Sequence, residues 1–261
     1  MAIELFNDGK HVCLMFNDLV DDTGSDAVQA NQFLLVSDGE GALIDPAGNM
    51  TYNALIMAMQ RFFPFKNLKY IFASHQDPDI VASLNKWLVA TDCTLYVSAL
   101  WERFVPHFCT ANRTVGRMVG IPDRGMVIPM RDTHVVAVPA HFLHAEGNFQ
   151  FYDSKAKILF SGDMGASLVH HDKIVDPITT KAEFSANLKY MEGFHRRYMV
   201  SNKVCKYWVN MVRGMDVDML VPQHGRWYKG SEAIGAFLDW IENLHCGIDL
   251  FSQDNYKFPV G

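Results

Sequence analysis

Three histidines and three aspartates stand just beyond short, strongly apolar stretches of the sequence. They are His75, Asp77, Asp79, His144, Asp163 and His224. Their three imidazoles and three carboxylates form a mixed ligand set that suits iron, manganese or zinc better than calcium or a thiolate-preferring ion. Six ligands are more than one four-coordinate ion uses, whereas two ions about 3.5 to 4 Å apart that share a carboxylate would use all of them. The residue types therefore favour a dinuclear metal site.

The apolar stretches that precede these residues are predicted β-strands. Loops at the carboxyl ends of strands commonly form the sites of α/β folds, so the six side chains are expected to lie at such an edge. The strands that lead into them are predicted at residues 70–73, 134–138, 158–161 and 219–221.

The first half of the chain predicts strands that alternate with helices. Residues 32–45, QFLLVSDGEGALID, indicate a hairpin around a polar, glycine-containing turn. Apolar residues spaced by three and four after Thr51 predict a helix, and a second helix is expected to include Ile80 and Leu88. A further strand follows at residues 94–97. This alternation predicts parallel strand pairs joined by helical crossovers.

The second half again places strands before helices. It predicts strands at 134–138, 149–152, 158–161 and 219–221, a long helical region from about 185 to 211, and a helix from Ser231. Both halves together indicate an α/β (α+β) protein built as an αββα sandwich, with two packed sheets inside and helices outside. Because no linker rich in proline, glycine or serine separates the halves, a single domain over residues 1–261 is expected.

The six residues also resemble a known family pattern. The stretch from His75 to Ile80, HQDPDI, is similar to the His-x-His-x-Asp-His motif of the metallo-β-lactamase superfamily, but it lacks the second and last histidines. A carboxylate at the second position resembles the flavodiiron branch instead, whose motif is His-x-Glu-x-Asp. The later ligands follow at similar spacing, with 64 residues between Asp79 and His144, 18 between His144 and Asp163, and 60 between Asp163 and His224.

The resemblance implies a metallo-β-lactamase-like fold and a particular division of the ligands. His75, Asp77 and His144 would hold one iron, Asp79 and His224 would hold the other, and Asp163 would bridge them. The sequence departs from the family at two positions. Asp77 stands where the family usually has glutamate, and Ile80 stands where it frequently has histidine.

The resemblance is closest to stand-alone oxygen-binding di-iron proteins, which lack the flavodoxin domain of typical flavodiiron proteins. It implies two non-haem iron ions, with manganese or zinc as alternatives, and no encoded FMN. The implied function is O2 binding, as a peroxo-bridged diferric adduct, by an oxygen sensor of bacterial chemotaxis with receptor or kinase proteins as partners. One alternative is an O2 or NO reductase fed by an external electron donor, and another is a zinc-dependent hydrolase.

Charge and composition exclude other classes of function. Twenty-three basic against 29 acidic residues give a net charge of −6, which lacks the basic excess typical of nucleic-acid binding. No stretch reaches the roughly 18 to 20 apolar residues of a membrane helix. The five cysteines are scattered and form no CxxC pair, which favours a reducing cytoplasm over a disulfide framework.

Three further histidines are weaker candidates for the same site. His141 precedes His144 by three residues, so it could lie behind the metal ligands or in a polar loop. The pair His170 and His171 follows Asp163 and could line the mouth of a pocket.

Overall fold

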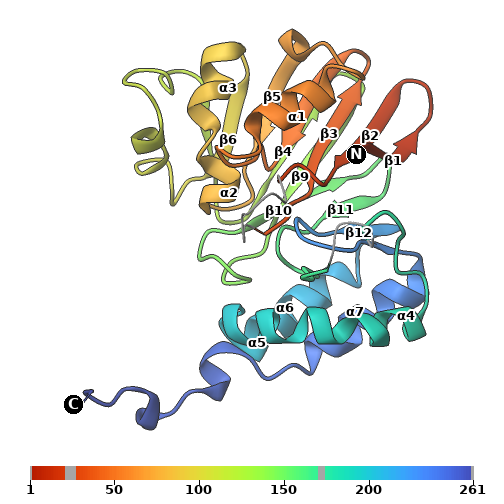
Figure 1. Cartoon of the computed structure of the whole chain (residues 1–261), viewed down its shortest axis with the longest axis vertical. Helices are drawn as coiled ribbons and strands as arrows, with labels where there is room; N and C mark the ends of the chain where they lie inside the picture. The colour runs from red at the N-terminus through yellow and green to blue at the C-terminus, as the bar shows by residue number, and fades with distance from the viewer. Residues whose placement is uncertain (1, 21–27, 170–173, 260–261) are drawn as a thin grey trace.

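The structure is a computed structural model that describes residues 2–20, 28–169 and 174–259. Within these residues, two mixed β-sheets pack face to face between two layers of helices (Figure 1). The first sheet has the strand order β1-β2-β3-β4-β5-β6-β7, and the second has the order β13-β12-β11-β10-β9-β8.

The strands are short, and they include all the predicted ones together with five that were not predicted, at residues 2–7, 11–16, 118–121, 126–130 and 228–229. The first sheet contains β1 (Ala2–Asn7), β2 (His11–Phe16), β3 (Gln32–Ser37), β4 (Glu40–Ile44), β5 (Leu68–Phe72), β6 (Thr94–Ser98) and β7 (Met118–Ile121). The second contains β8 (Met126–Met130), β9 (Thr133–Pro139), β10 (Phe149–Asp153), β11 (Ile158–Phe160), β12 (Met219–Val221) and β13 (Tyr228–Lys229). The predicted hairpin at residues 32–45 is confirmed as the antiparallel pair β3–β4, and β10 and β11 form a second antiparallel pair.

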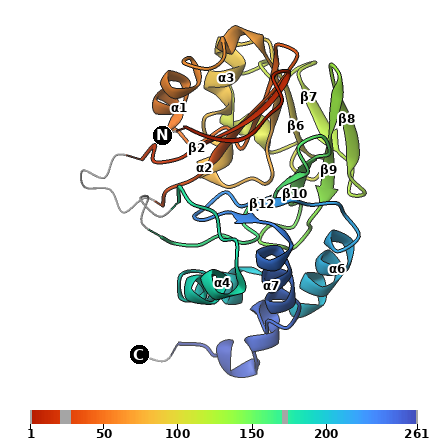
Figure 2. The ribbon, with the colours of Figure 1, turned by 90° about the vertical axis from the view of Figure 1, so that its right-hand side faces the viewer.

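The helices cover the outer faces of the two sheets (Figures 1 and 2). On the first sheet lie α1 (Tyr52–Met59), α2 (Pro78–Val81) and α3 (Leu84–Ala90). On the second lie α4 (Lys181–Asn187), α5 (Glu192–Tyr198), α6 (Asn202–Val212) and α7 (Ser231–Glu242). Each helical layer shares a buried hydrophobic cluster with the sheet beneath it. This order of layers confirms the predicted αββα sandwich.

The core between the sheets is rich in phenylalanine. Phe72 of the first sheet stacks on Phe151 of the second with ring centroids 5.1 Å apart, and Phe33 meets Phe160 at 4.8 Å. All four side chains are almost completely buried. Because aromatic pairs bury a large apolar area, these contacts fix the two sheets against each other.

The strands that lead to the candidate ligands have the expected directions. β4, β5, β6 and β7 are mutually parallel in the first sheet, and β11 and β12 are parallel in the second. β5 ends just before His75, β11 before Asp163 and β12 before His224. Parallel neighbours bring their carboxyl ends to one edge, so the arrangement places these residues on neighbouring loops.

The long helical region predicted from about 185 to 211 is helical in the structure, but it is not one continuous helix. The structure divides this region into α4, a short 3-10 turn, α5 and α6, with extended backbone at Met199 between α5 and α6. There the chain pairs with the loop that carries His144, because Met199 bridges Leu143 and the Val200 N–H donates to the Phe142 carbonyl over 3.2 Å. Backbone pairing to a distant loop has therefore overridden the local helical pattern.

The second predicted helix is likewise divided, into α2 and α3. Ser83 stands between the two segments, and its hydroxyl donates to the Pro46 carbonyl over 2.9 Å. The Trp87 indole donates to the same carbonyl over 2.9 Å. These bonds tie the start of α3 to the loop after β4 and leave α2 as a separate turn that carries the candidate ligand Asp79.

A buried polar cluster joins the sheets at the end opposite the candidate ligands. His11 of β2 contacts the Asp153 carboxylate at the end of β10, and both side chains are fully buried. The Cys13 thiol donates to the same carboxylate over 3.3 Å. Burial favours a raised pKa for Asp153, but the hydrogen bond with His11 outweighs it and holds the pKa below its usual value. The cluster is therefore an internal hydrogen-bonded link between the sheets.

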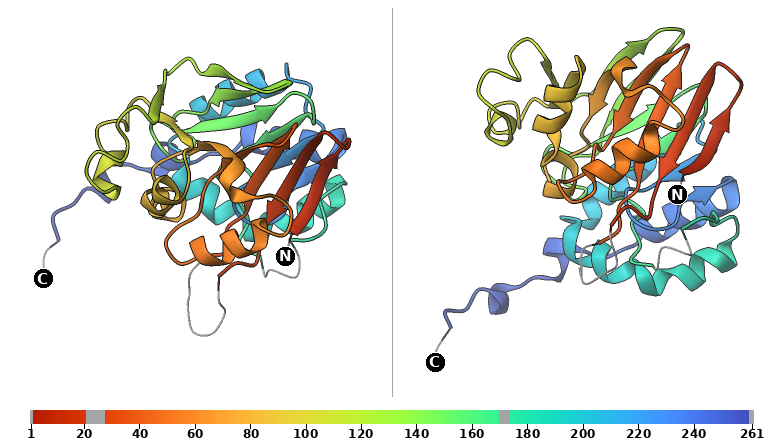
Figure 3. Two further views of the ribbon diagram at one scale, coloured as in Figure 1. Left: turned by 90° about the horizontal axis from the view of Figure 1, so that it is seen from above. Right: turned by 45° about the horizontal axis from the view of Figure 1, so that its top comes forward.

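None of the helices in the described part of the chain is both long enough and apolar enough to cross a bilayer. Residues 251–259 extend away from the body of the protein and are exposed along their length (Figure 3).

Removing the acceptor of the buried cluster should destabilise the protein. Asp153→Ala leaves His11 and Cys13 without their partner in the core, so we expect the free energy of unfolding to fall by roughly 3 to 5 kcal/mol. Urea denaturation followed by circular dichroism measures this change. The control is Asp216→Ala, which removes an exposed ion pair with Lys157 and should leave the unfolding midpoint almost unchanged. Equal midpoints for the two variants would contradict a stabilising role for the cluster.

Candidate metal centre

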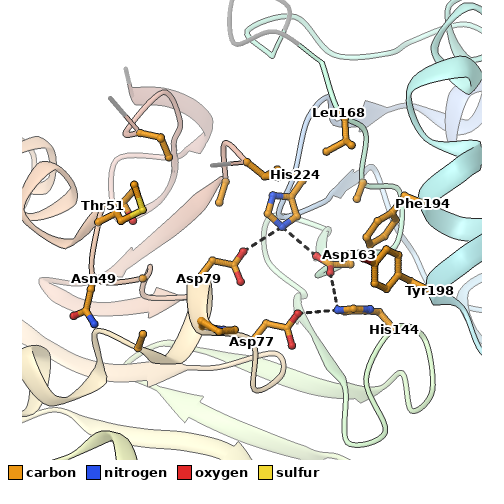
Figure 4. A pocket seen from close by; sticks show the side chains of 18 residues that line it. Asn49, Thr51, Asp77, Asp79, His144, Asp163, Leu168, Phe194, Tyr198 and His224 are labelled. Atoms are coloured by element: carbon orange, nitrogen blue, oxygen red, sulfur yellow. Dashed lines mark hydrogen bonds and ion pairs between the residues drawn. The ribbon is translucent and has the colours of Figure 1, made fainter. Parts of the chain in front are cut away.

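The Asp163 carboxylate lies at the centre of the predicted ligands (Figure 4). Its Oδ2 atom is 3.6 Å from His75 Nε2 and 3.5 Å from His144 Nε2. Its Oδ1 atom is 3.6 Å from His224 Nε2. The two oxygens of one nearly buried carboxylate thus face two different sets of side chains, as a bridging ligand requires.

One set consists of His75, Asp77 and His144. Asp77 Oδ2 is 2.9 Å from His144 Nε2 and 3.7 Å from His75 Nε2. The two imidazole rings stand perpendicular, with centroids 5.1 Å apart. One ligand atom from each of these three residues lies within 4.8 Å of the others. This set can therefore surround one ion together with Asp163 Oδ2.

The other set consists of Asp79 and His224. Asp79 Oδ2 is 3.3 Å from His224 Nε2 and accepts a hydrogen bond from the Gln223 side chain over 3.2 Å. Ile80 is fully buried in the hydrophobic cluster under the first helical layer, so it contributes nothing to this set. Together with Asp163 Oδ1, the second position has one protein ligand fewer than the first.

Local structure explains how the loop after β5 presents three ligands. The Ser74 N–H donates to the buried Asp45 carboxylate over 2.9 Å, and the Ser74 hydroxyl lies 2.9 Å from His75 Nδ1. Burial raises the pKa of Asp45 to about 6. Pro78 then begins α2, which places Asp77 just before the helix and Asp79 in its first turn. Because α2 starts between Asp77 and Asp79, both carboxylates are directed toward Asp163.

The electrostatics of the site require positive charge. Burial alone would lower the pKa of His75, but the neighbouring Asp163 and Asp77 outweigh it and raise this pKa to about 9. His224 behaves alike, since burial is outweighed by Asp79 and Asp163 and its pKa also rises to about 9. Burial favours a raised pKa for Asp77, but hydrogen bonds from His144 and His75 hold it well below the usual value. In the metal-free protein, protons on the imidazoles thus balance the negative charge of the carboxylates. Metal cations at the site would do the same.

The unused bonding capacity of the residues fits two metal ions. Asp163 Oδ1 is buried and has no hydrogen-bond partner. His224 Nδ1 donates to the Gln29 carbonyl over 2.8 Å, which leaves Nε2 of the neutral ring free to bind an ion between Asp79 and Asp163. Such a hydrogen bond on the outer ring nitrogen is typical of histidines that bind metals. The donor set is of nitrogen and oxygen only, as suits iron, manganese or zinc.

A cavity of about 680 Å³ opens directly onto this site. Polar ligands form its floor and apolar side chains form much of its wall, among them Ala166, Leu168 and Phe194. Phe194 and Tyr198 pack their rings against His144 with centroid distances of 5.8 and 5.1 Å (Figure 4). Neither aromatic residue is among those predicted for the site. Their spacing of four, which places both on one helix face, is the signal that could have located them there.

The structure brings together all six residues predicted as ligands, and it excludes one of the weaker candidates from the cavity. His141 Nε2 donates to the Asp123 carbonyl over 2.7 Å, and its ring packs on Phe149. It does not line the cavity. His170 and His171 lie outside the described residues, so their predicted place at the pocket mouth stays a prediction.

A family model described as ODP family beta lactamase matches residues 28–225, a range that contains all six candidate ligands. The chain belongs to this family. Two solved structures of the chemotaxis sensor ODP agree with the match along nearly the whole chain. Its apo state from T. denticola is 37% identical, covers 98% of this chain and 99% of that chain, and has a TM-score of 0.85. Its peroxy diiron species is 36% identical over the same shares, with a TM-score of 0.83.

This ODP-family chain is also similar to more distant proteins, in structure to one and in sequence to another. A flavo di-iron protein of Thermotoga maritima is 18% identical, with a TM-score of 0.76 over 93% of this chain and 60% of that chain. An uncharacterized protein of Methanocaldococcus jannaschii is 24% identical over 80% of this chain, and the chain spans about half (52%) of its length. The predicted resemblance to the flavodiiron branch of the metallo-β-lactamase superfamily, and within it to a stand-alone di-iron group, is confirmed.

Metal binding should release protons from the two histidines with raised pKa values. At pH 7 the metal-free protein keeps His75 and His224 protonated because both pKa values are about 9. Metals bind only neutral imidazole, so loading the pair at pH 7 should release about two protons per chain, and affinity should fall as the pH is lowered from 9 to 6. Titration calorimetry in buffers of different ionisation enthalpy measures this release. Binding without proton release would contradict the assignment of these two residues as ligands.

Proposed function

We propose that this protein binds O2 at a di-iron centre and serves as an oxygen sensor in bacterial chemotaxis. One observation carries the proposal. A set of six ligands, with a carboxylate where zinc hydrolases of this fold have histidine, lies in a chain that matches a chemotaxis sensor along 98% of its length at 36 to 37% identity.

The six residues divide between two metal positions. His75, Asp77 and His144 would hold one ion, Asp79 and His224 would hold the other, and Asp163 would be shared between them. A ferrous pair would supply the two electrons that O2 binding at such a centre requires. The three carboxylates favour iron, since they bring more negative charge than a site richer in histidine. Because the second position has one protein ligand fewer, it leaves room for an exchangeable ligand on the side that faces the cavity.

The cavity wall selects what reaches this position. Its apolar side chains, with Leu168 and Phe194 beside the ligands, favour a small apolar molecule such as O2 over water and ions. Tyr198 and Phe194 also cover His144 and limit the movement of its ring. The chain's own residues thus orient the ligands and place an apolar wall beside them.

Signalling further requires a partner that responds to the occupied centre. We propose a receptor or kinase of the chemotaxis array in this role, with the protein acting in the cytoplasm as a single domain. The alternative is an O2 or NO reductase that receives electrons from a separate donor protein.

The first experiment follows O2 binding by the ferrous-loaded protein. Anaerobic protein with two irons per chain receives one equivalent of O2, and its visible spectrum is recorded for minutes. A long-lived charge-transfer band is expected for a sensor. Sustained O2 consumption in the presence of a reductant, with no lasting band, would overturn the sensor in favour of a reductase. Full occupancy by zinc with no affinity for iron would favour a hydrolase.

Two variants make this test specific to the centre. Asp163→Asn should leave fewer than two irons per chain by elemental analysis and abolish the band, because it removes a charge from the shared ligand. His141→Gln is the matched control, since it changes a nearby histidine that does not line the cavity. The control should retain both irons and the band. Two firmly bound irons in Asp163→Asn would contradict the bridging assignment.

A second experiment tests the signalling role directly. Purified receptor and kinase of a chemotaxis array are combined with the iron-loaded protein, and kinase autophosphorylation is measured with and without O2. A rate that depends on O2 only when the protein is present supports the sensor. An unchanged rate at saturating protein concentration would argue against this partner.

A further inference from the structure

Two buried asparagines hold the loops that carry His224 and His144. We propose that Asn31 and Asn148 are positioning residues, each specific for one of the two metal positions. This inference rests on the proposed metal centre. Neither residue offers a ligand atom to the centre, and each acts through the backbone on which a histidine is mounted.

Asn31 fixes the loop around His224 from both sides. Its side-chain Nδ2 donates to the Pro222 carbonyl over 2.9 Å and to the Gly225 carbonyl over 3.0 Å. Its backbone N–H donates to the Gln223 carbonyl. The residue is fully buried and lies some 190 positions away in the sequence, at the start of β3. These three hydrogen bonds, to the carbonyls of residues 222, 223 and 225, therefore restrict the movement of the loop that carries His224.

The same loop turns sharply next to Ser167. Gly225 has a φ of +77°, and a Cβ atom there would lie 2.1 Å from the Ser167 carbonyl oxygen. The Ser167 N–H donates to the His224 carbonyl over 3.1 Å. The chain therefore packs closely against a neighbouring loop, and the Asn31 amide connects the residues before and after His224 through its bonds to Pro222 and Gly225.

Asn148 plays the corresponding role for His144. Its side-chain Nδ2 donates to the Leu143 carbonyl, directly before the ligand. Its backbone closes the loop further, because its carbonyl accepts from the Ala140 N–H over 3.0 Å and its N–H donates to the Ala145 carbonyl over 3.3 Å. His144 itself has a φ of +76°, an unusual conformation for a residue with a side chain. An external bond is needed to hold a ligand in that conformation.

An apolar residue cannot replace either amide without loss. With leucine at position 31, the Pro222 and Gly225 carbonyls would lose their buried donor, and leucine at 148 would do the same to Leu143. Each loop would relax to recover its hydrogen bonds. Outer-sphere changes of this kind typically weaken metal binding by about 10- to 100-fold. The loss should fall on one metal position in each variant.

The test compares two matched variants, Asn31→Leu and Asn148→Leu, with the full-length protein. Co²⁺ serves as the probe because its absorption bands report the ligands around it. Titration gives the number of ions and their affinities, and His224→Ala and His144→Ala give the reference spectra of proteins that lack one ligand at either position. Asn31→Ala and Asn148→Ala replace a leucine variant that fails to fold.

We expect each asparagine variant to retain one tightly bound Co²⁺ and to bind the other about 10- to 100-fold more weakly. The spectrum of Asn31→Leu with one ion should match that of His224→Ala, and the spectrum of Asn148→Leu should match that of His144→Ala. A general loss of stability would weaken both positions in both variants and would overturn the proposal, as would unchanged affinities. Failure of the unaltered protein to bind two ions would instead refute the metal centre itself.

Discussion

The concentration of negative charge around Asp163 is the constraint on which the rest of the site depends. Three carboxylates face the site, that of Asp163 nearly buried and those of Asp77 and Asp79 partly exposed, and each lies within 4 Å of an imidazole nitrogen. In the absence of cations, the histidines take up protons and their pKa values rise. Buried charges of one sign are tolerated only with compensating charge, which here means protons or metal ions.

The fold delivers these groups from both sheets to a single point. The loop after β5 brings three ligands from the first sheet, while the loops after β9, β11 and β12 bring one each from the second. The site therefore forms only when the two sheets are correctly packed. Phe72 against Phe151 in the core, and His11 against Asp153 at the far end, fix that packing at positions remote from the ligands.

The two metal positions have different numbers of ligands, and the loops that carry their histidines are held by different residues. The loop of His224 is held by Asn31 from the beginning of β3, whereas the loop of His144 is held by Asn148 from its own hairpin and by the strand-like contact at Met199. The break between α5 and α6 is part of the second arrangement, because it frees the backbone that pairs with residues 142 and 143. Phe194 and Tyr198 on α5 then face the same histidine. A movement of His144 would consequently displace α5 first.

The sequence by itself determined the sandwich, the parallel strands and the six candidate ligands, because each depends on local periodicity or on residue types at fixed spacing. His75, Asp77 and Asp79 could be recognised together since they occupy one short loop after an apolar strand. The break at Met199, the exclusion of His141 from the cavity, and the supports from Asn31 and Asn148 could not be recognised in this way. Each depends on hydrogen bonds or packing between segments that are distant in the chain, or on a backbone conformation imposed by those contacts. Tertiary structure alone decided them, since no local pattern records which distant carbonyl a buried amide will meet.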